Sequence, residues 1–531
     1  MKQVTSTALF MGVLLLGGPV HGGDFSNAMN RLNEEDLAGA RPYVLEYSKD
    51  HPGEAGALLL EMRMRFLENR FGDAMELLNA IRNSEESDIL EQWRAFEDLV
   101  QSTWSATQHH KQITLGNGKV VVHVEPGVDE VLLLYMEEAI VQAQKTYAEI
   151  FGEPVYAEPL HIHIYGKIET LAAVSSLKVS EIQNSGTIAL CKYNRLMITS
   201  PRDLLYGYDW LDTLAHEYVH YVISKRNGNT VPIWIHEGLA KFFENRWREA
   251  DDASLRPSSQ DLLARALKER ELIPFEAMSP SMAKLPTQED TALAFAEVFT
   301  VMDFMKEEVG IEGIRKMLDA LKDGETDREA MEIAMGTSFA EFEKNWKKWL
   351  GKQPLADLPV KHRSRLYFKN KNQSTDEFEE IGEKQAQDFV YLGDLLRARK
   401  RLLAASKEYE KAVAIVGTTS PVIQAKLATT FLALERPKDA LDAVVPPLSF
   451  HPKYVLLRLN QGKALLALGK NQEAAEALEQ AVRINPFDVD IHERLLEAVI
   501  GVGDETRAAR ERKAIDILNG ESGRTGSGER E

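Results

Sequence analysis

The chain has 531 residues, of which 44% are hydrophobic and 27% charged, so its composition excludes a disordered or collagen-like protein. This length predicts about three domains. The 82 acidic residues outnumber the 63 basic ones and give a net charge of −19, which argues against a nucleic-acid-binding function. Because Cys191 is the single cysteine, any metal ion must be held by histidine and carboxylate side chains.

The first 22 residues have the features of a signal peptide. Lys2 gives a positive start, and the apolar run ALFMGVLLLGG follows it. Val20 and Gly22 stand where a signal peptidase would need small residues. The rest of the sequence has no apolar run of about 18 residues, so we expect the mature protein not to be integral to a membrane. The predicted location is the periplasm or the cell exterior.

A fainter helical repeat follows the signal peptide. Ala40 and Ala74 are spaced by 34 residues, and we expect Gly72-Asp73 to form the turn between two amphipathic helices. The pattern predicts a short tetratricopeptide-repeat-like (TPR-like) helical segment over residues 24–100, and an unrelated helical hairpin is the alternative.

The middle of the chain, residues 111–350, has a mixed pattern. Residues 119–124 and 160–165 alternate like strands, and residues 187–198 predict a β-hairpin. From Asp209 onward the pattern is helical. A small sheet followed by helices is typical of an α+β domain.

One helix of this domain is expected to carry the chemistry. The sequence HEYVH places His216 and His220 one turn apart on one helix face, where both can bind one metal ion. Glu217 lies beside them and can take a proton from a water molecule. The flanking residues predict a helix that begins after Asp209 and ends at Asn227. Two histidines alone do not hold zinc, so a third ligand is required.

A second helix, predicted over residues 232–247, supplies the third ligand. Glu237 lies 17 residues after His220 and is the expected ligand. His236 is the alternative, although it would point about 100° away from Glu237 around the helix. We expect the small residue Gly238 to let this helix pack tightly against the HExxH helix.

Together, HExxH, a short loop and WIHEGLAKFFE resemble the peptidase MA-type gluzincin domain. In that family two histidines and the glutamate of the EGLA segment bind zinc. The resemblance covers about residues 155–350 and implies one zinc ion per catalytic domain, held by His216, His220 and Glu237. It also implies that peptide bonds are hydrolysed by a zinc-activated water, with Glu217 as general base.

One residue departs from the family pattern. The family often has a tyrosine that steadies the oxyanion, and this chain has Phe295 in the matching segment. Tyr206, Tyr208 and Tyr221 are the candidates to replace it.

Two further groups of residues are candidates for a role near a metal. Asp212, one helical turn before His216, could accept a hydrogen bond from an imidazole N–H, or it could simply favour the helix dipole. His161 and His163 share one strand face at a spacing that could suit a metal, but a polar strand face is the favoured interpretation.

The expected hairpin suggests where a substrate would bind. Its turn is predicted at Tyr193-Asn194, and the strand before it carries Thr187, Ala189 and Cys191. An edge strand at this place could pair with an extended peptide, which is the usual binding mode of a protease.

The C-terminal region, residues 385–518, has a 34-residue period. Ala440, Ala474 and Ala508 recur at this spacing, and Gly462 is a small residue in the clearest unit. Small residues at fixed positions allow two helices of a hairpin to approach closely. The pattern resembles the tetratricopeptide repeat (TPR) and implies a protein partner.

Two stretches are expected to lack a fold of their own. Residues 351–384 are polar and charge-rich and are predicted to form a linker. Residues 519–531 have no apolar side chain and are predicted to form a disordered tail. The expected architecture is therefore multidomain, with an α+β zincin-like metallopeptidase domain flanked by all-α TPR-like repeats.

Two functions of different classes fit these features. The first is an exported zinc metallopeptidase whose repeats recruit a protein or peptide substrate or a protein partner, and the intact Glu217 favours it. The second is a weakly active or non-catalytic TPR scaffold that retains a zinc-binding peptidase-like domain, and Phe295 favours that one.

Overall fold

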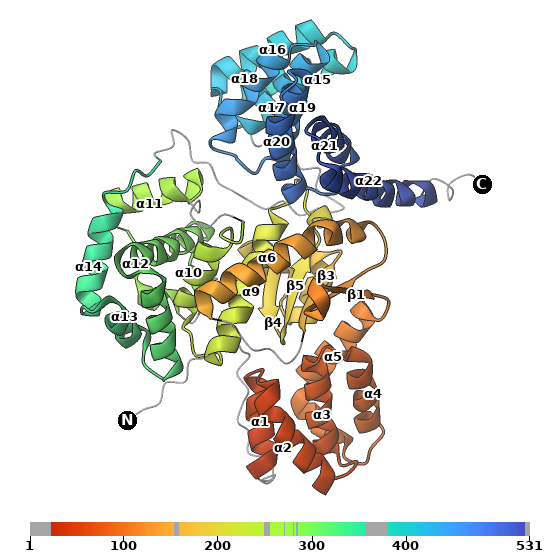
Figure 1. Cartoon of the computed structure of the whole chain (residues 1–531), viewed down its shortest axis with the longest axis vertical. Helices are drawn as coiled ribbons and strands as arrows, with labels where there is room; N and C mark the ends of the chain where they lie inside the picture. The colour runs from red at the N-terminus through yellow and green to blue at the C-terminus, as the bar shows by residue number, and fades with distance from the viewer. Residues whose placement is uncertain are drawn as a thin grey trace. The chain divides into compact units, whose positions relative to one another are not determined.

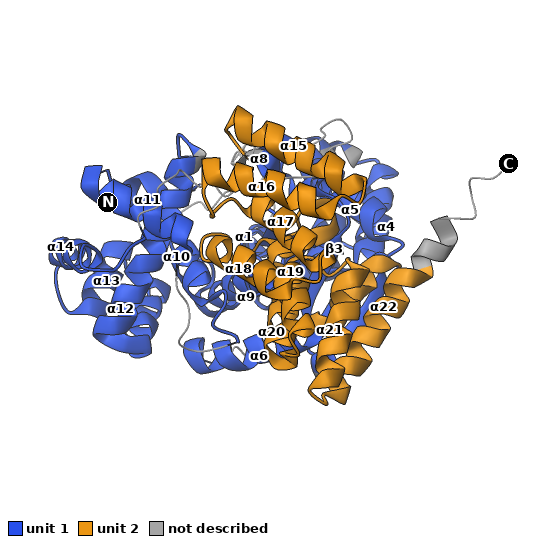
Figure 2. Cartoon of the chain, turned by 90° about the horizontal axis from the view of Figure 1, so that it is seen from above, with its two compact units in different colours: residues 1–126, 137–199, 212–362 blue, residues 127–136, 200–211, 363–531 orange. Residues whose placement is uncertain are grey.

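The computed structural model forms two compact units (Figure 2). Residues 1–22, which carry the predicted signal peptide, and residues 357–380 of the predicted linker lie outside the described residues. Across the described residues, every helix is too short or too polar to cross a membrane. The described residues are 23–152, 159–248, 255–269, 271–279, 281–282, 285–356 and 381–525. Unit 1 comprises residues 1–126, 137–199 and 212–362, and unit 2 comprises residues 127–136, 200–211 and 363–531.

Unit 1 begins with paired helices (Figure 1). They are α1 (Gly23–Asn33), α2 (Leu37–Asp50), α3 (Ala55–Leu67), α4 (Phe71–Arg82) and α5 (Arg94–Thr107), with the 3-10 helix η1 (Ser87–Trp93) before α5. Ala40 and Ala74, which share the 34-residue spacing, are fully buried. The turn predicted at Gly72-Asp73 is wrong, because both residues lie inside α4. The chain turns instead at Asn69, which adopts the left-handed conformation that asparagine tolerates.

A five-stranded mixed sheet follows, in the order β1-β2-β3-β5-β4. The strands are β1 (Lys111–Leu115), β2 (Val120–Val124), β3 (Leu160–Tyr165), β4 (Ala189–Lys192) and β5 (Arg195–Thr199). Strands β2, β3 and β5 are parallel, and β1 and β4 are antiparallel to their neighbours. The sequence predicted all of these strands except β1, whose short KQITL segment has only two apolar side chains. The predicted hairpin is formed by β4 and β5.

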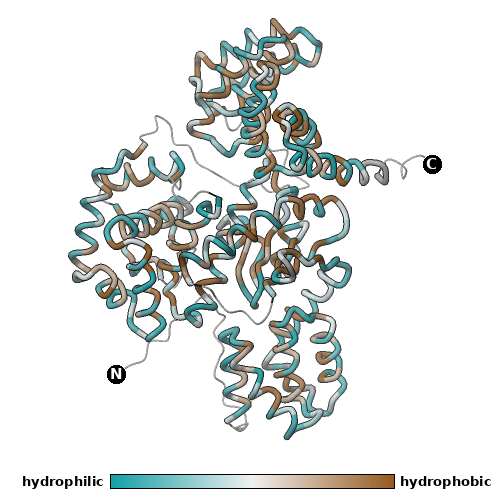
Figure 3. Tube along the Cα trace, viewed as in Figure 1, coloured by the Kyte–Doolittle hydropathy of each residue, from teal (hydrophilic) through white to brown (hydrophobic). Residues whose placement is uncertain are grey.

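The two faces of the sheet differ in chemistry. One face carries buried valine and isoleucine side chains, including Val122 and Ile162, and the strands are largely hydrophobic (Figure 3). The alternation of side chains puts His123, His163 and Arg195 on the opposite face, where all three are also buried. This polar face is covered by α3 and α4: the Arg195 guanidinium lies over the rings of Phe66 and Phe71.

Helices complete unit 1. They are α6 (Leu133–Phe151), α7 (Ile168–Ser175), α8 (Val179–Ser185), α9 (Trp210–Asn227), α10 (Ile233–Phe243), α11 (Pro257–Glu269), α12 (Gln288–Lys322), α13 (Asp327–Met335) and α14 (Phe339–Leu350). The 3-10 turns η2 (Gly116–Gly118) and η5 (Phe275–Met278) also belong to unit 1, whereas η3 (Val128–Leu132) and η4 (Pro201–Asp203) belong to unit 2. The expected packing of Gly238 against the HExxH helix is wrong. A Cβ atom at Gly238 would lie 3.1 Å from the carbonyl oxygen of Val298, so the close neighbour of α10 at this point is α12.

Unit 2 contains an array of helical hairpins. Its helices are α15 (Lys384–Ala398), α16 (Leu402–Val416), α17 (Pro421–Ala433), α18 (Pro437–Leu448), α19 (Val455–Ala467), α20 (Asn471–Ile484), α21 (Val489–Gly501) and α22 (Glu505–Thr525). Ala440, Ala474 and Ala508 are fully buried, as the period requires. The disordered tail predicted over residues 519–531 is wrong for residues 519–525, because α22 continues to Thr525. Residues 526–531 lie outside the described residues.

Gly462 is expected to be essential for packing within the array. A Cβ atom there would lie 2.4 Å from Cγ of Leu478, so Gly462→Ala should destabilise unit 2 by about 1–3 kcal/mol. Gly520→Ala is the matched control, because no atom lies within 4 Å of the added methyl group and alanine favours the helix. Urea unfolding of the two variants measures the difference. Equal stability of the two variants would contradict the prediction.

Acid is expected to destabilise unit 1 through the polar sheet face. Burial lowers the pKa of His123 to about 3, and burial and Arg195 lower the pKa of His161 to about 4. Histidines of the unfolded chain bind protons near pH 6.5. Between about pH 6.5 and about pH 4 the unfolded state therefore binds more protons than the folded state. As the pH is lowered through this range, the free energy of unfolding decreases by about 1.4 kcal/mol per pH unit for each histidine.

The dependence can be measured from urea unfolding at a series of pH values. His161→Gln should make the dependence shallower, whereas His109→Gln, which changes an exposed histidine, should leave it unchanged. A pH dependence that is the same in both variants would contradict the assignment.

Candidate metal centre

Two helices bring three possible metal ligands together. Nε2 of His216 lies 3.1 Å from Nε2 of His220 on α9, and each of these atoms lies 3.5 Å from Oε2 of Glu237 on α10. Ligands that bind one zinc ion at about 2.0–2.2 Å in tetrahedral geometry are separated by roughly 3.3 Å. The three atoms therefore fit around one zinc ion.

The charges of this group also suit a cation. Burial alone would lower the pKa of His216, but hydrogen bonds to Glu237 and Glu244 raise it to about 10. Burial alone would raise the pKa of Glu237, but the two facing imidazoles hold it well below its usual range. The carboxylates thus stabilise positive charge at the point where the three ligand atoms converge.

Glu244 orients the first histidine. Its Oε2 atom lies 3.2 Å from Nδ1 of His216, and its Oε1 atom accepts a hydrogen bond of 2.6 Å from Nζ of Lys241. A proton held on Nδ1 leaves the lone pair on Nε2 for a metal. Glu244 was not predicted from the sequence, although it lies seven residues after Glu237 and therefore on the same face of the helix.

The role suggested for Asp212 is corrected by this geometry. Asp212 accepts a hydrogen bond of 3.2 Å from the indole N–H of Trp247 and another from Arg248. Its carboxylate therefore ties the start of α9 to the segment after α10. The carboxylate that meets an imidazole of the HExxH motif is that of Glu244.

His236, the alternative third ligand, is placed differently. Its Nδ1 atom hydrogen-bonds Nδ1 of His220, and its Nε2 atom lies 3.3 Å from Oγ of Ser224. It therefore contacts the side of the His220 ring that faces away from Nε2. Burial, followed by the charge of His220, lowers the pKa of His236 to about 3, so His236 stays neutral and can accept the Nδ1 proton of His220.

The proposed general base lies beside the edge of the sheet. Glu217 is buried, which raises the pKa of its carboxyl group, and its carboxylate accepts a hydrogen bond from the backbone N–H of Cys191 in β4. β4 is an edge strand of the described sheet. The antiparallel register turns the N–H and C=O groups of Ala189 and Cys191 away from β5, and Thr187 precedes the strand.

The tyrosines suggested as oxyanion partners occupy different surroundings. In unit 2 the ring of Tyr206 packs on Tyr454, and the backbone N–H of Tyr208 donates to the carbonyl of Ile484. In unit 1 Tyr221 is buried, with its ring on Tyr218. Phe295 is half-buried on α12. The oxyanion-stabilising residue stays a prediction.

A second group of histidines does not have the geometry of a metal site. Ring nitrogens of His123, His161 and His163 lie within 4.8 Å of one another. However, the rings of His123 and His163 are stacked at 4.0 Å with their planes 7° apart, so their lone pairs cannot converge on one ion. The nearby positive charge of Arg195 also opposes a bound cation. The polar strand face is the better interpretation.

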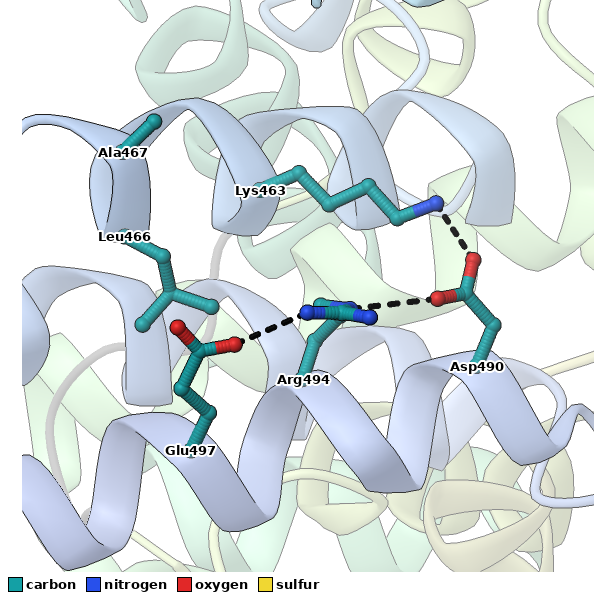
Figure 4. A pocket seen from close by; sticks show the side chains of 6 residues that line it. All are labelled: Lys463, Leu466, Ala467, Asp490, Arg494 and Glu497. Atoms are coloured by element: carbon teal, nitrogen blue, oxygen red, sulfur yellow. Dashed lines mark hydrogen bonds and ion pairs between the residues drawn. The ribbon is translucent and has the colours of Figure 1, made fainter.

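Unit 2 has a shallow pocket between α19 and α21 (Figure 4). Its charged side chains are paired with one another: Asp490 binds both Lys463 and Arg494, and Arg494 also binds Glu497 at 2.9 Å. The charges in the pocket therefore neutralise one another, and no strong preference for a charged small ligand follows from them.

Comparison with known proteins agrees with this arrangement. Residues 137–352 match the Peptidase MA superfamily, and residues 425–489 and 459–511 match the tetratricopeptide repeat. The resemblances found in the sequence are thereby confirmed. Comparison with curated proteins gives no match.

The solved structures that match include distant ones with low TM-scores. "MamA MSR-1 C2" is 18% identical, with 26% of this chain and 78% of that chain covered and a TM-score of 0.24. "MamA RS-1 ArsTM double mutant" is 14% identical, with 41% and 96% covered and a TM-score of 0.24. Matches at this level add nothing to the assignment of the fold or the function.

Glu244 and Asp212 can be separated by zinc affinity. Glu244→Gln should weaken zinc binding by about 10- to 100-fold, because the amide no longer fixes the Nδ1 proton of His216. Asp212→Asn removes a nearby carboxylate that bonds Trp247 and Arg248, and should weaken zinc binding much less. Competition with a chromophoric chelator measures both affinities. An equal or larger loss in Asp212→Asn would contradict the assignment.

Proposed function

We propose that this chain, which carries a Peptidase MA superfamily domain and tetratricopeptide repeats, is an exported zinc-dependent metallopeptidase. The observation that carries the proposal is the convergence of His216, His220 and Glu237 next to the buried Glu217. Export rests on the signal-peptide features of residues 1–22.

The three ligands would hold one zinc ion and leave a coordination position open. Two neutral imidazoles and one carboxylate form the ligand set of a catalytic zinc site rather than a closed structural one. When bound, zinc supplies a Lewis acid that polarises a carbonyl group and makes water a better nucleophile near neutral pH. Glu244 and His236 would keep the two histidines in the required tautomer.

Glu217 would move the proton. As water attacks the peptide carbonyl, the carboxylate takes one of its protons, and a new C–O bond forms. Glu217 then delivers this proton to the amide nitrogen while the C–N bond breaks, which gives a carboxylic acid and an amine; the acid passes its proton to the amine, so the final products are a carboxylate and an ammonium group. Burial raises the pKa of Glu217, which suits a group that must both accept and release a proton.

The edge strand would align the substrate. The outward C=O groups of Ala189 and Cys191 and the outward N–H of Ala189 match the spacing of an extended peptide, which would add to the sheet as a further strand, whereas the N–H of Cys191 already donates to Glu217. Because Glu217 accepts the N–H of Cys191, a peptide at this edge would lie next to the general base.

The C-terminal repeats would recruit a protein. TPR arrays mediate protein–protein interaction, and α15 exposes three large apolar side chains on its surface. These are Tyr391, Leu392 and Leu395. A protein substrate or a partner could therefore bind unit 2 through apolar contacts.

A scaffold with little or no activity is the second candidate. Phe295 cannot donate a hydrogen bond to an oxyanion, whereas the tyrosine often found in the family can. In that case the peptidase domain would bind zinc without hydrolysing peptides.

Glu217→Gln tests the proposal. The variant should bind zinc with the same stoichiometry and lose about 10²- to 10⁴-fold in the hydrolysis of a denatured protein, because the amide cannot accept a proton. His216→Ala is the control that should lose zinc.

Two outcomes would contradict the proposal. Wild-type protein that binds zinc but cleaves no better than Glu217→Gln would indicate the scaffold. Wild-type protein without stoichiometric zinc would overturn the ligand assignment.

A further inference from the structure

The turn of the β4–β5 hairpin has an unfavourable sequence for its shape. Tyr193 and Asn194 both have a φ of 58°. A two-residue hairpin turn with two positive φ values favours Asn-Gly or similar pairs, because side chains crowd the backbone in this region. Asparagine tolerates the conformation, but tyrosine does so less well. The turn therefore needs support from elsewhere.

Glu35 provides that support. Its Oε1 atom accepts the backbone N–H of Tyr193 at 2.8 Å, and its Oε2 atom accepts the backbone N–H of Asn194 at 2.8 Å. One carboxylate thus binds both amides of the turn through charge-assisted hydrogen bonds. Glu35 lies in the short connection between α1 and α2 and itself has a φ of 58°.

The next repeat of the N-terminal segment holds the same hairpin. Nδ2 of Asn194 donates to the carbonyl of Leu67 at 3.2 Å. Arg195, the first residue of β5, is fully buried, and its guanidinium lies 4.7 Å from the ring centre of Phe66 and 4.8 Å from that of Phe71. Contacts from two helical hairpins therefore converge on one turn.

The turn is close to the proposed general base. Cys191, which donates its N–H to Glu217, lies only two residues before Tyr193. β4 has four residues and, in the described sheet, pairs only with β5. A short edge strand is held by few ladder hydrogen bonds, so its position depends on its turn.

We propose that Glu35 is a positioning residue for the peptidase site, because it fixes the Tyr193-Asn194 turn and with it the strand that meets Glu217. The proposal rests on the proposed function, because it assumes that the substrate binds along β4. The N-terminal segment is then part of the catalytic unit. Its inter-helix turns at Glu35 and Asn69 make contacts inside this unit, where Asn69 bonds His163.

Glu35→Gln is the informative variant. It keeps the size of the side chain, but its NH₂ group would face a backbone N–H, so one hydrogen bond and the negative charge are lost. We expect amide hydrogen exchange in residues 189–195 to become about tenfold faster and KM for an unfolded peptide substrate to rise about tenfold. Zinc stoichiometry should not change, because the ligands lie on α9 and α10.

Glu34→Gln is the matched control. Glu34 is the adjacent residue, its side chain is exposed, and its contact to Asn229 is made by the backbone carbonyl. This variant should behave like the wild type.

The outcomes separate this proposal from the proposed function. Unchanged exchange and unchanged KM in Glu35→Gln would overturn the role of Glu35 while leaving the peptidase intact. Faster exchange spread over the whole of unit 1, instead of residues 189–195, would also overturn it. If wild-type protein hydrolyses no peptide, the proposed function fails. Faster exchange in Glu35→Gln that is confined to residues 189–195 would still show that Glu35 fixes the position of β4.

Discussion

The close contact between α10 and α12 sets the position of the candidate metal site. Two of its possible ligands, His216 and His220, follow from the period of one helix, but the third depends on how a second helix is placed. Gly238 follows Glu237 directly, and a Cβ atom there would lie 3.1 Å from the carbonyl oxygen of Val298. A side chain at this position would push α10 away from α12 and move the Glu237 carboxylate relative to the two imidazoles. The glycine of the EGLA segment is therefore required by packing rather than by chemistry.

His216 and His220 have hydrogen-bond partners of different charge. Nδ1 of His216 meets the carboxylate of Glu244, whereas Nδ1 of His220 meets the imidazole of His236, which burial keeps neutral. Both partners fix a tautomer, but only one adds negative charge. A carboxylate in place of His236 would add a second negative charge to that of Glu237, which already raises the pKa of Glu217, and would raise this pKa further. A neutral partner orients the second histidine without this effect.

Local patterns made part of this site predictable from the sequence. The HExxH spacing and the strand alternation depend only on the helix and strand periods, and the structure has both. The choice between Asp212 and Glu244 depends on tertiary structure, because each is a carboxylate on the relevant helices and only the crossing of α9 and α10 decides which meets His216. The turn at Asn69 was missed because Gly72 is a strong turn signal that α4 nevertheless accommodates.

The polar face of the sheet explains why the N-terminal segment belongs to unit 1. In the sequence, His161 and His163 alternate with apolar residues and predict a polar strand face. In the structure His163 is buried on this face together with His123 and Arg195, and aromatic rings and the side chain of Asn69 from α3, α4 and their connection cover it. A buried guanidinium is costly unless it is compensated, and two phenylalanine rings compensate Arg195 only while the helices stay in place. The helical segment and the sheet therefore stabilise each other, which a periodicity of 34 residues could not reveal.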